Sequence, residues 1–97
     1  MKLEQLSGKR LLVPETNGVE DADLPEFMPP HASYTVHFVC SGSGQVTLRA
    51  NGRKWISYPC DGVENVAEQI TDKFPQTVSL TLSGSARWKA AVADGSV

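Results

Sequence analysis

Apolar and polar residues alternate along most of the chain after residue 33, which predicts β-strands with one buried face. Each run is short, contains β-branched or aromatic residues, and is bounded by glycine, serine, asparagine or proline. In most runs the apolar positions share one parity, so their side chains are expected on one face of the strand. The runs that predict strands are 34–40, 46–50, 53–58, 77–82 and 86–92.

Short polar segments separate these runs. Residues 41–44 (SGSG) and 83–85 (SGS) predict turns, because glycine and serine are common turn residues. Asn51-Gly52 is a strong hairpin signal, since both central residues of a type I′ turn need positive φ. We therefore expect the first three strands to form an antiparallel meander and the last two to form a hairpin.

One segment has helical periodicity instead. Asp61 is a suitable helix N-cap, and Glu64 follows three residues later as in a capping box. We expect one short helical crossover near residues 62–72, ending before Pro75. Its apolar positions, spaced i, i+3, i+4 and i+7, are Val63, Val66, Ala67 and Ile70.

The first third of the chain has a different composition. Residues 14–32 hold four of the six prolines, and proline opposes both helices and strand ladders. We interpret residues 1–33 as an N-terminal arm or linker with a possible edge strand at 10–13 that ends at Pro14. Its apolar residues Leu24, Phe27 and Met28 could attach the arm to the core. Residues 34–94 are expected to form the folded domain, followed by a tail at 95–97.

The strand-dense pattern predicts an all-β fold. A single open sheet would leave an apolar face in water, whereas two packed sheets bury both apolar faces. We expect a small Ig-like antiparallel β-sandwich of about five to seven strands, with a small barrel as the neighbouring architecture. The Cys…Trp…Cys spacing of antibody domains is absent, because Trp55 lies only five residues before Cys60.

Composition excludes several functional classes. The chain has 97 residues, a formal net charge of −2 and 40% hydrophobic residues. It contains no apolar run of about 20 residues that could span a bilayer as a helix. It also lacks the large basic excess of a dedicated nucleic-acid binder. Acidic residues are concentrated in the first 33 positions, whereas residues 34–97 carry six basic and five acidic side chains.

No catalytic or cofactor motif is present. The chain has neither a glycine-rich phosphate loop followed by a helix nor a nucleophile elbow. His37 and Cys40 lie three apart in a strand and so point to opposite faces, which disfavours a Cys–His dyad. His31 lies in the proline-rich segment and is expected to be solvated. The acidic side chains are assigned to the wet face of the expected helix, at Asp61, Glu64, Glu68 and Asp72. We expect a protein that is not an enzyme and that uses no cofactor.

The two cysteines, Cys40 and Cys60, leave three alternatives: a disulfide, two buried free thiols, or half of a metal site. The zinc-ligand spacings of known structural sites are missing, which disfavours a metal. Residues 1–12 show no apolar signal-peptide core. The chain is therefore either a cytosolic protein with free thiols or an extracytoplasmic domain whose targeting segment lies outside this sequence. We favour the second.

The remaining candidate chemistry is on the surface. Basic side chains occupy outward parities of the predicted strands or flank the Asn51-Gly52 turn, and together they would suit an anionic polymer or an acidic partner. Alternatively, they keep a sheet face soluble and its edges unpaired. Trp55 could stack on a ligand or cover a sheet edge, whereas Trp88 shares its parity with core residues. The expected binding surface is Arg49, Arg53, Lys54, Trp55, Arg87 and Lys89.

Four segments resemble small secreted or lipoprotein-type domains of actinobacteria, most of them without an assigned function. The segments are YTVHFVCSGSGQVTLRANG, YPCDG, TVSLTLSG and ARWKAAVAD, which together extend over residues 34–94. This resemblance implies an exported β-sandwich with a disulfide between Cys40 and Cys60, and it implies no active-site residues.

These observations lead to one expected function and one alternative. We expect a non-catalytic, extracytoplasmic binding or structural module of the cell envelope, whose partner is another protein or an anionic envelope polymer. The alternative is a small intracellular or phage-encoded accessory protein that acts through a protein partner. Neither a metal nor a nucleic acid is expected as a ligand, and the sequence predicts no oligomeric state.

Overall fold

The computed structural model describes residues 3–6, 8–71 and 74–95, and within this range the protein is all-β. All strand pairs are antiparallel, and the described residues contain no helix. The seven strands are β1 (Leu11–Gly18), β2 (Ala22–Asp23), β3 (Ser33–Ala50), β4 (Arg53–Asp61), β5 (Asn65–Ile70), β6 (Val78–Leu82) and β7 (Ala86–Asp94).

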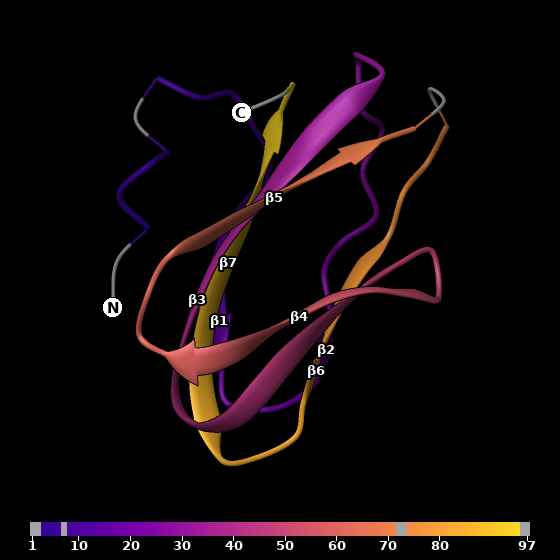
Figure 1. Cartoon of the computed structure of the whole chain (residues 1–97). Helices are drawn as coiled ribbons and strands as arrows, with labels where there is room; N and C mark the ends of the chain where they lie inside the picture. The colour runs from indigo at the N-terminus through magenta and orange to yellow at the C-terminus, as the bar shows by residue number, and fades with distance from the viewer. Residues whose placement is uncertain (1–2, 7, 72–73, 96–97) are drawn as a thin grey trace.

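The long strand β3 is the centre of the fold. Along one edge it pairs with β7 and then with β6, and along its other edge it pairs with β5 and then with β4. Strand β1 pairs with the outer edge of β7, and β2 pairs with β6. The strands curl around a common interior, as Figure 1 shows. The expected all-β class is confirmed, but the sheet is barrel-like and nearly closed instead of a clear two-sheet sandwich, because β3 belongs to both halves.

Residues 41–44 form a bend inside β3 and not a turn between two strands. Strands β6 and β7, expected as a hairpin, do not pair with each other; both pair with β3. The register runs one for one from the Tyr34–Asp94 pair to the Ala50–Val78 pair, and only the bend interrupts it. The expected meander and terminal hairpin are therefore wrong, because β3 is one long strand and β6 and β7 follow one another along it. The glycine-serine segment between β6 and β7 lies opposite the one inside β3.

The two glycine-serine segments hold each other in place. Ser43 donates from its backbone N–H to the carbonyl of Ser85 at 2.9 Å, and the backbone N–H of Ser85 donates to the Ser43 hydroxyl at 3.1 Å. A Cβ on Gly42 would lie 2.5 Å from the Ser85 carbonyl oxygen, and one on Gly84 would lie 2.6 Å from the Ser43 carbonyl oxygen. Glycine is required here because the two backbones approach too closely for a side chain.

The expected helix at 62–72 is wrong, because residues 65–70 form β5. The first half of β3 offers an edge opposite β7, and β5 fills it, with Val36 opposite Ala67 and Ser33 opposite Ile70. A helix of one or two turns gains little by itself, whereas strand pairing satisfies the backbone along β3. Asp61 accepts from the backbone N–H of Val63 at 3.1 Å, so it makes a local turn instead of a helix cap.

The expected edge strand at 10–13 exists as β1, but it continues past Pro14 to Gly18. The register with β7 shifts between Leu11 and Val13 and again between Val13 and Thr16, the interval that contains Pro14. Such irregularities are the usual way in which a strand accommodates a proline. Leu24 and Phe27 are buried in the core, whereas Met28 is exposed. Much of the proline-rich segment thus contributes strands and core residues.

The interior is lined by the inward faces that the alternation predicts. Fully buried aromatic and aliphatic side chains come from β1, β3, β6 and β7, and Trp88 is 2% exposed. The hairpin at Asn51-Gly52 is confirmed, with φ of 53° and 81° at its two central residues. The cluster includes Val13, Tyr34, Val36, Phe38, Val46, Leu48, Val78, Leu80, Trp88, Ala90 and Val92.

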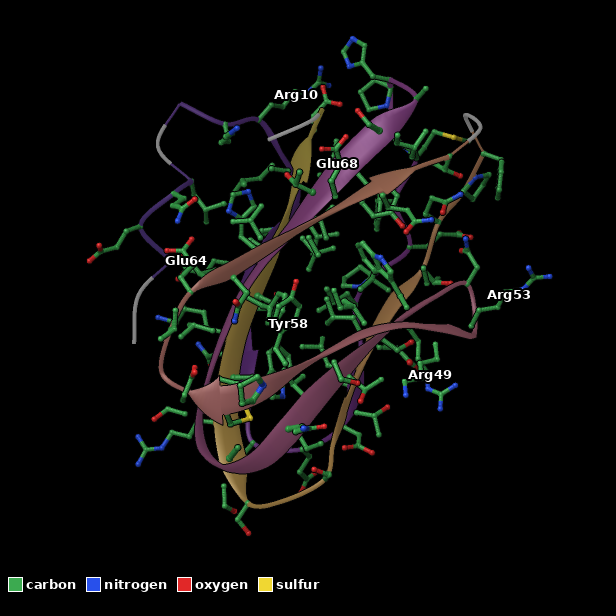
Figure 2. The ribbon with its side chains drawn as sticks, in the orientation of Figure 1. Arg10, Arg49, Arg53, Tyr58, Glu64 and Glu68 are labelled. Atoms are coloured by element: carbon green, nitrogen blue, oxygen red, sulfur yellow. A yellow bond between two sulfur atoms is a disulfide. The ribbon has the colours of Figure 1, made fainter. Side chains whose placement is uncertain are left out.

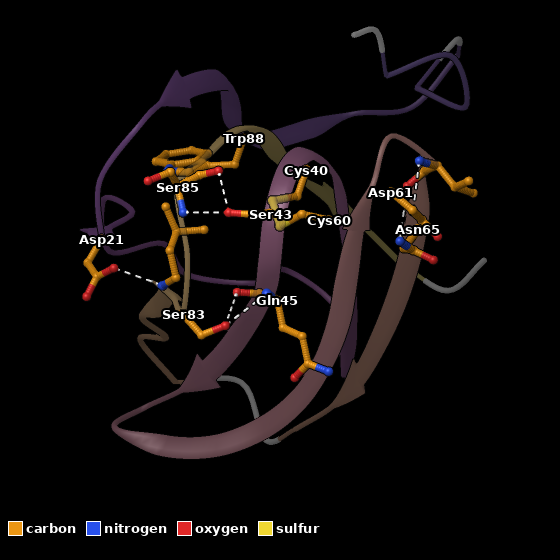
Figure 3. The surroundings of a disulfide bond; sticks show 12 residues. Asp21, Cys40, Ser43, Gln45, Cys60, Asp61, Asn65, Ser83, Ser85 and Trp88 are labelled. Atoms are coloured by element: carbon orange, nitrogen blue, oxygen red, sulfur yellow. Dashed lines mark hydrogen bonds between the residues drawn. A yellow bond between two sulfur atoms is a disulfide. The ribbon is translucent and has the colours of Figure 1, made fainter.

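Cys40 and Cys60 form a disulfide, with their Cα atoms 4.5 Å apart. It connects β3 just before its bend to the end of β4, and Figure 3 shows it beside the paired Ser43 and Ser85. Of the three alternatives, the disulfide is therefore confirmed. Closing a loop of this length stabilises the fold by about 3 kcal/mol in the chain-entropy account.

Candidate binding surface

The basic residues expected to form one patch lie in two places. Arg87 is on β7 opposite Ser41, before the bend of β3, whereas Arg49 is beyond the bend, opposite Lys54 and Ser79. Figure 2 shows Arg49 and Arg53 on the same side of the molecule, near the β3–β4 hairpin. The bend separates residues that a straight sheet would have placed on one continuous face.

The first place is a depression at the hairpin end of β4, which we call the hairpin surface. It has a volume of about 570 Å³. Trp55 is half-buried there, and Phe74 is 45% exposed. The hairpin surface is lined by Ala50, Asn51, Arg53, Lys54, Trp55, Gln69 and Phe74. It thus combines two accessible aromatic rings, two cations and two side-chain amides.

A polar network around the buried Gln76 fixes the hairpin beneath this surface. The side-chain amide of Asn51 donates to Gln76 Oε1 at 2.7 Å, and the Asn51 oxygen accepts from the backbone N–H of Thr77 at 3.0 Å. Gln76 is 1% exposed and donates to the carbonyl of Phe74 at 3.2 Å. These hydrogen bonds connect the Asn51 turn to Gln76 and to the backbone at Phe74 and Thr77, so the aromatic and basic side chains project from a hydrogen-bonded base.

Aromatic packing ties the hairpin surface to the core. The Trp55 ring meets the Tyr34 ring edge-on, with centroids 6.4 Å apart, and Tyr34 in turn meets Phe27 at 4.8 Å. Burial raises the pKa of Tyr34 to about 12, so its hydroxyl stays protonated and points toward Gln76 at 3.5 Å. One edge of Trp55 is therefore anchored while the ring still borders solvent.

The charged side chains that line the hairpin surface are all positive. Among the described residues that line it, none is acidic, and neither Arg53 nor Lys54 makes an ion pair in the described structure. Arg49, which pairs with Lys54 across the two strands, also makes no ion pair with a carboxylate in the described structure. Unpaired cations attract anionic groups, and neighbouring aromatic rings exclude water from the contact, which strengthens that attraction.

The second place is a wider, open depression of about 1090 Å³ around the bend, beside β7. Arg87 and Lys89 lie on its rim, but Lys89 is 3.4 Å from the Glu15 carboxylate. Trp88 is buried beneath it and donates its indole N–H to the carbonyl of Glu20 at 2.8 Å. This region therefore has fewer free cations and no accessible indole face.

A buried histidine lies on β3 at a position that no sequence motif marks as a special site. His37 is 2% exposed, its Nε2 is 3.3 Å from the Thr35 hydroxyl, and its Nδ1 has no hydrogen-bond partner in the described structure. The Nδ1 atom lies 3.7 Å from Glu64 Oε2. Burial lowers the pKa of His37, the Glu64 carboxylate opposes that shift, and Lys9 reinforces it.

Glu64 also holds the N-terminal segment next to His37. Its carboxylate accepts backbone N–H groups of Glu4 at 2.7 Å and Gln5 at 3.2 Å, so it fastens the N-terminal segment beside β5. The expected place of Glu64 on the wet face of a helix is therefore wrong. Its side chain is only 12% exposed, because it lies between the N-terminal segment and His37.

The other titratable candidates do not lie together in one site in the described structure. His31 pairs with Asp94 at 3.0 Å, and its side chain remains 68% exposed. Asp61 and Glu68 are exposed, and Asp72 lies outside the described residues. Within residues 3–6, 8–71 and 74–95, no three His, Cys, Asp or Glu side chains are close enough to hold a metal.

Comparisons of the chain with protein-family models, curated proteins and solved structures find no match. The resemblance of residues 34–94 to small secreted actinobacterial domains therefore stays a prediction. In the part of the chain that the structure describes, no helix is long and apolar enough to cross a membrane.

Proposed function

We propose that this protein is a non-catalytic binding module that holds an acidic partner against the hairpin surface. The observation that supports it most directly is the convergence of Arg53 and Lys54 with Trp55 and Phe74 around one depression. The cations supply long-range attraction, and the aromatic rings supply apolar contact area once the partner is seated.

We further propose that the module works outside the cytoplasm. The Cys40–Cys60 disulfide supports this placement, since structural disulfides persist mainly in oxidising compartments. An acidic partner there is either an anionic envelope polymer or an acidic protein. The same disulfide is the observation that weighs against the intracellular accessory protein.

The proposal can be tested with polyglutamate and a polyuronate as defined acidic probes. Binding is followed by tryptophan fluorescence, to which the half-buried Trp55 contributes, and by calorimetry at low and moderate salt. We expect the double variant Arg53→Glu/Lys54→Glu to bind both probes at least about 10-fold more weakly, because it reverses the two cations. Affinity should also fall as salt screens the attraction.

A control of the same charge change keeps the test specific. Arg10→Glu/Arg87→Glu alters the net charge equally but leaves the hairpin surface intact, since Arg10 and Arg87 are exposed elsewhere. We expect its affinity to stay within about twofold of the parent protein. Equal losses in the two double variants, or no binding to either probe, would refute the proposed site.

A further inference from the structure

We infer that the free edge of β4 takes up an extended acidic segment of a partner protein as an added strand. This inference rests on the proposed function and specifies its partner and its mode of binding. Strand β4 (Arg53–Asp61) pairs with β3 along one edge, and no described strand pairs with its other edge. An unpaired edge presents backbone donors and acceptors that a second chain can use.

The free edge of β4 lies on the side where β4 and β5 separate. Strands β4 and β5 pair with the same edge of β3 but at different heights, so they diverge from the turn that joins them (Figure 1). Figure 2 shows Tyr58 between the two strands. Tyr58 is half-buried against Phe38, with ring centroids 5.0 Å apart, so the side chains of an added strand would meet aromatic surface there.

The other free edges fit such a segment less well. Strand β1 contains Pro14 and Glu15 and is irregular in register, and β2 has only two residues. The free edge of β5 follows Glu64 and carries Glu68. Proline and like charge both discourage pairing with an acidic strand.

Among these free edges, β4 has the charge that best fits an acidic segment. It begins with Arg53 and Lys54, and it contains no acidic residue before Asp61 and no proline before Pro59. Strand β4 has one register shift with β3, at Trp55, and residues 56–58 beyond it pair regularly with β3 and include neither proline nor an acidic residue. The cations Arg53 and Lys54 lie at the start of this edge. An extended segment with glutamate or aspartate near one end and β-branched residues along its length matches both features.

The test uses a synthetic peptide of about eight residues, a length typical of one strand, with two glutamates near one end and valine and threonine along the rest. A twin peptide carries N-methyl groups on alternate backbone amides, which removes hydrogen-bond donors from one edge but keeps the charge. Polyglutamate serves as a disordered acidic reference. We expect the unmodified peptide to bind at least about 10-fold more tightly than its twin, because the lost backbone hydrogen bonds are worth at least that ratio.

Hydrogen exchange locates the contact. Bound peptide should slow exchange of outward-facing amides within residues 54–58 and should leave the amides of β1 unchanged. The variant Arg53→Glu/Lys54→Glu should weaken the peptide at least about 10-fold, whereas Arg10→Glu/Arg87→Glu should leave its affinity within about twofold.

The outcomes separate the inference from the function it rests on. If the N-methylated twin and polyglutamate bind as tightly as the peptide, and only the Arg53/Lys54 variant loses them, strand addition is refuted and the acidic-partner function stands. If slowed amides lie outside β4, the assigned edge is wrong. If none of the acidic probes binds, the inference and the proposed function both fail.

Discussion

Replacing Gly84 with alanine tests whether the two glycine-serine segments hold β3 in its bent form. A Cβ at this position would lie 2.6 Å from the carbonyl oxygen of Ser43 and 2.9 Å from both the carbonyl carbon and the hydroxyl of Ser43. Two of these atoms are backbone, so they cannot move away without opening the bend.

The expected cost follows from this contact. Forcing an extra carbon into a packed site costs about 1–3 kcal/mol, and a backbone obstacle places this substitution near the upper end. Alanine also reduces the conformational entropy of the unfolded chain, which offsets about 0.4–1 kcal/mol of that destabilisation. We therefore expect Gly84→Ala to lower the free energy of unfolding by about 2 kcal/mol, or the melting temperature by about 8–16 °C.

Gly52→Ala is the matched control. Gly52 has φ of +81°, and no atom lies within 4 Å of the position that a Cβ would take there, so its substitution costs only backbone strain. That strain is about 1–2 kcal/mol, and the reduced entropy of the unfolded chain offsets about 0.4–1 kcal/mol of it, so the expected net cost is about 1 kcal/mol. Urea unfolding followed by tryptophan fluorescence, which includes the signal of the buried Trp88, measures both variants. A Gly84→Ala protein as stable as the parent, or more stable than Gly52→Ala, would refute the close contact between the segments.

Two further predictions concern the disulfide and the buried histidine. Cys40→Ala/Cys60→Ala should lower the free energy of unfolding by about 3 kcal/mol in a urea titration, and an unchanged midpoint would show that the disulfide adds no stability. Because burial lowers the pKa of His37 below its ordinary 6.5, the unfolded chain binds the proton first, so stability should fall as pH decreases below 6.5. His37→Gln should flatten this dependence and His31→Gln should keep it; the reverse result would contradict the assignment.

Local alternation predicted the strand faces because it reports directly on burial. Tyr34, Val36 and Phe38 share one parity and all lie in the core, and Trp88 is buried as its neighbours on β7 indicate. The Asn51-Gly52 hairpin was equally accessible, since its two residues both need positive φ and both have it. These features depend on residues close together in the chain.

The bent strand could not be predicted in the same way. Residues 41–44 and 83–85 each have the composition of a turn, and only their mutual hydrogen bonds turn them into coincident bends in paired strands. The helical spacing of 62–72 was misleading for a related reason. Residues 65–70 form a strand because they pair with an edge of β3, and no local sequence pattern indicates that this edge is available.

The candidate site was predicted in part. Arg53, Lys54 and Trp55 were selected by their places around the hairpin, and the structure brings them together with Gln69 and Phe74. No local pattern joins the latter two residues to the hairpin, because they come from β5 and the segment after it. Arg87 was grouped with Arg49 on parity alone, and the bend separates them.

Nuclear magnetic resonance mapping of an acidic probe tests the central claim most directly. In a titration of isotopically labelled protein with polyglutamate, we expect the largest amide shifts at Arg53, Lys54, Trp55, Gln69 and Phe74, with the Trp55 indole resonance among them. Shifts that cluster instead around Arg87 on β7, or that spread evenly over the surface, would contradict the hairpin surface as the binding site.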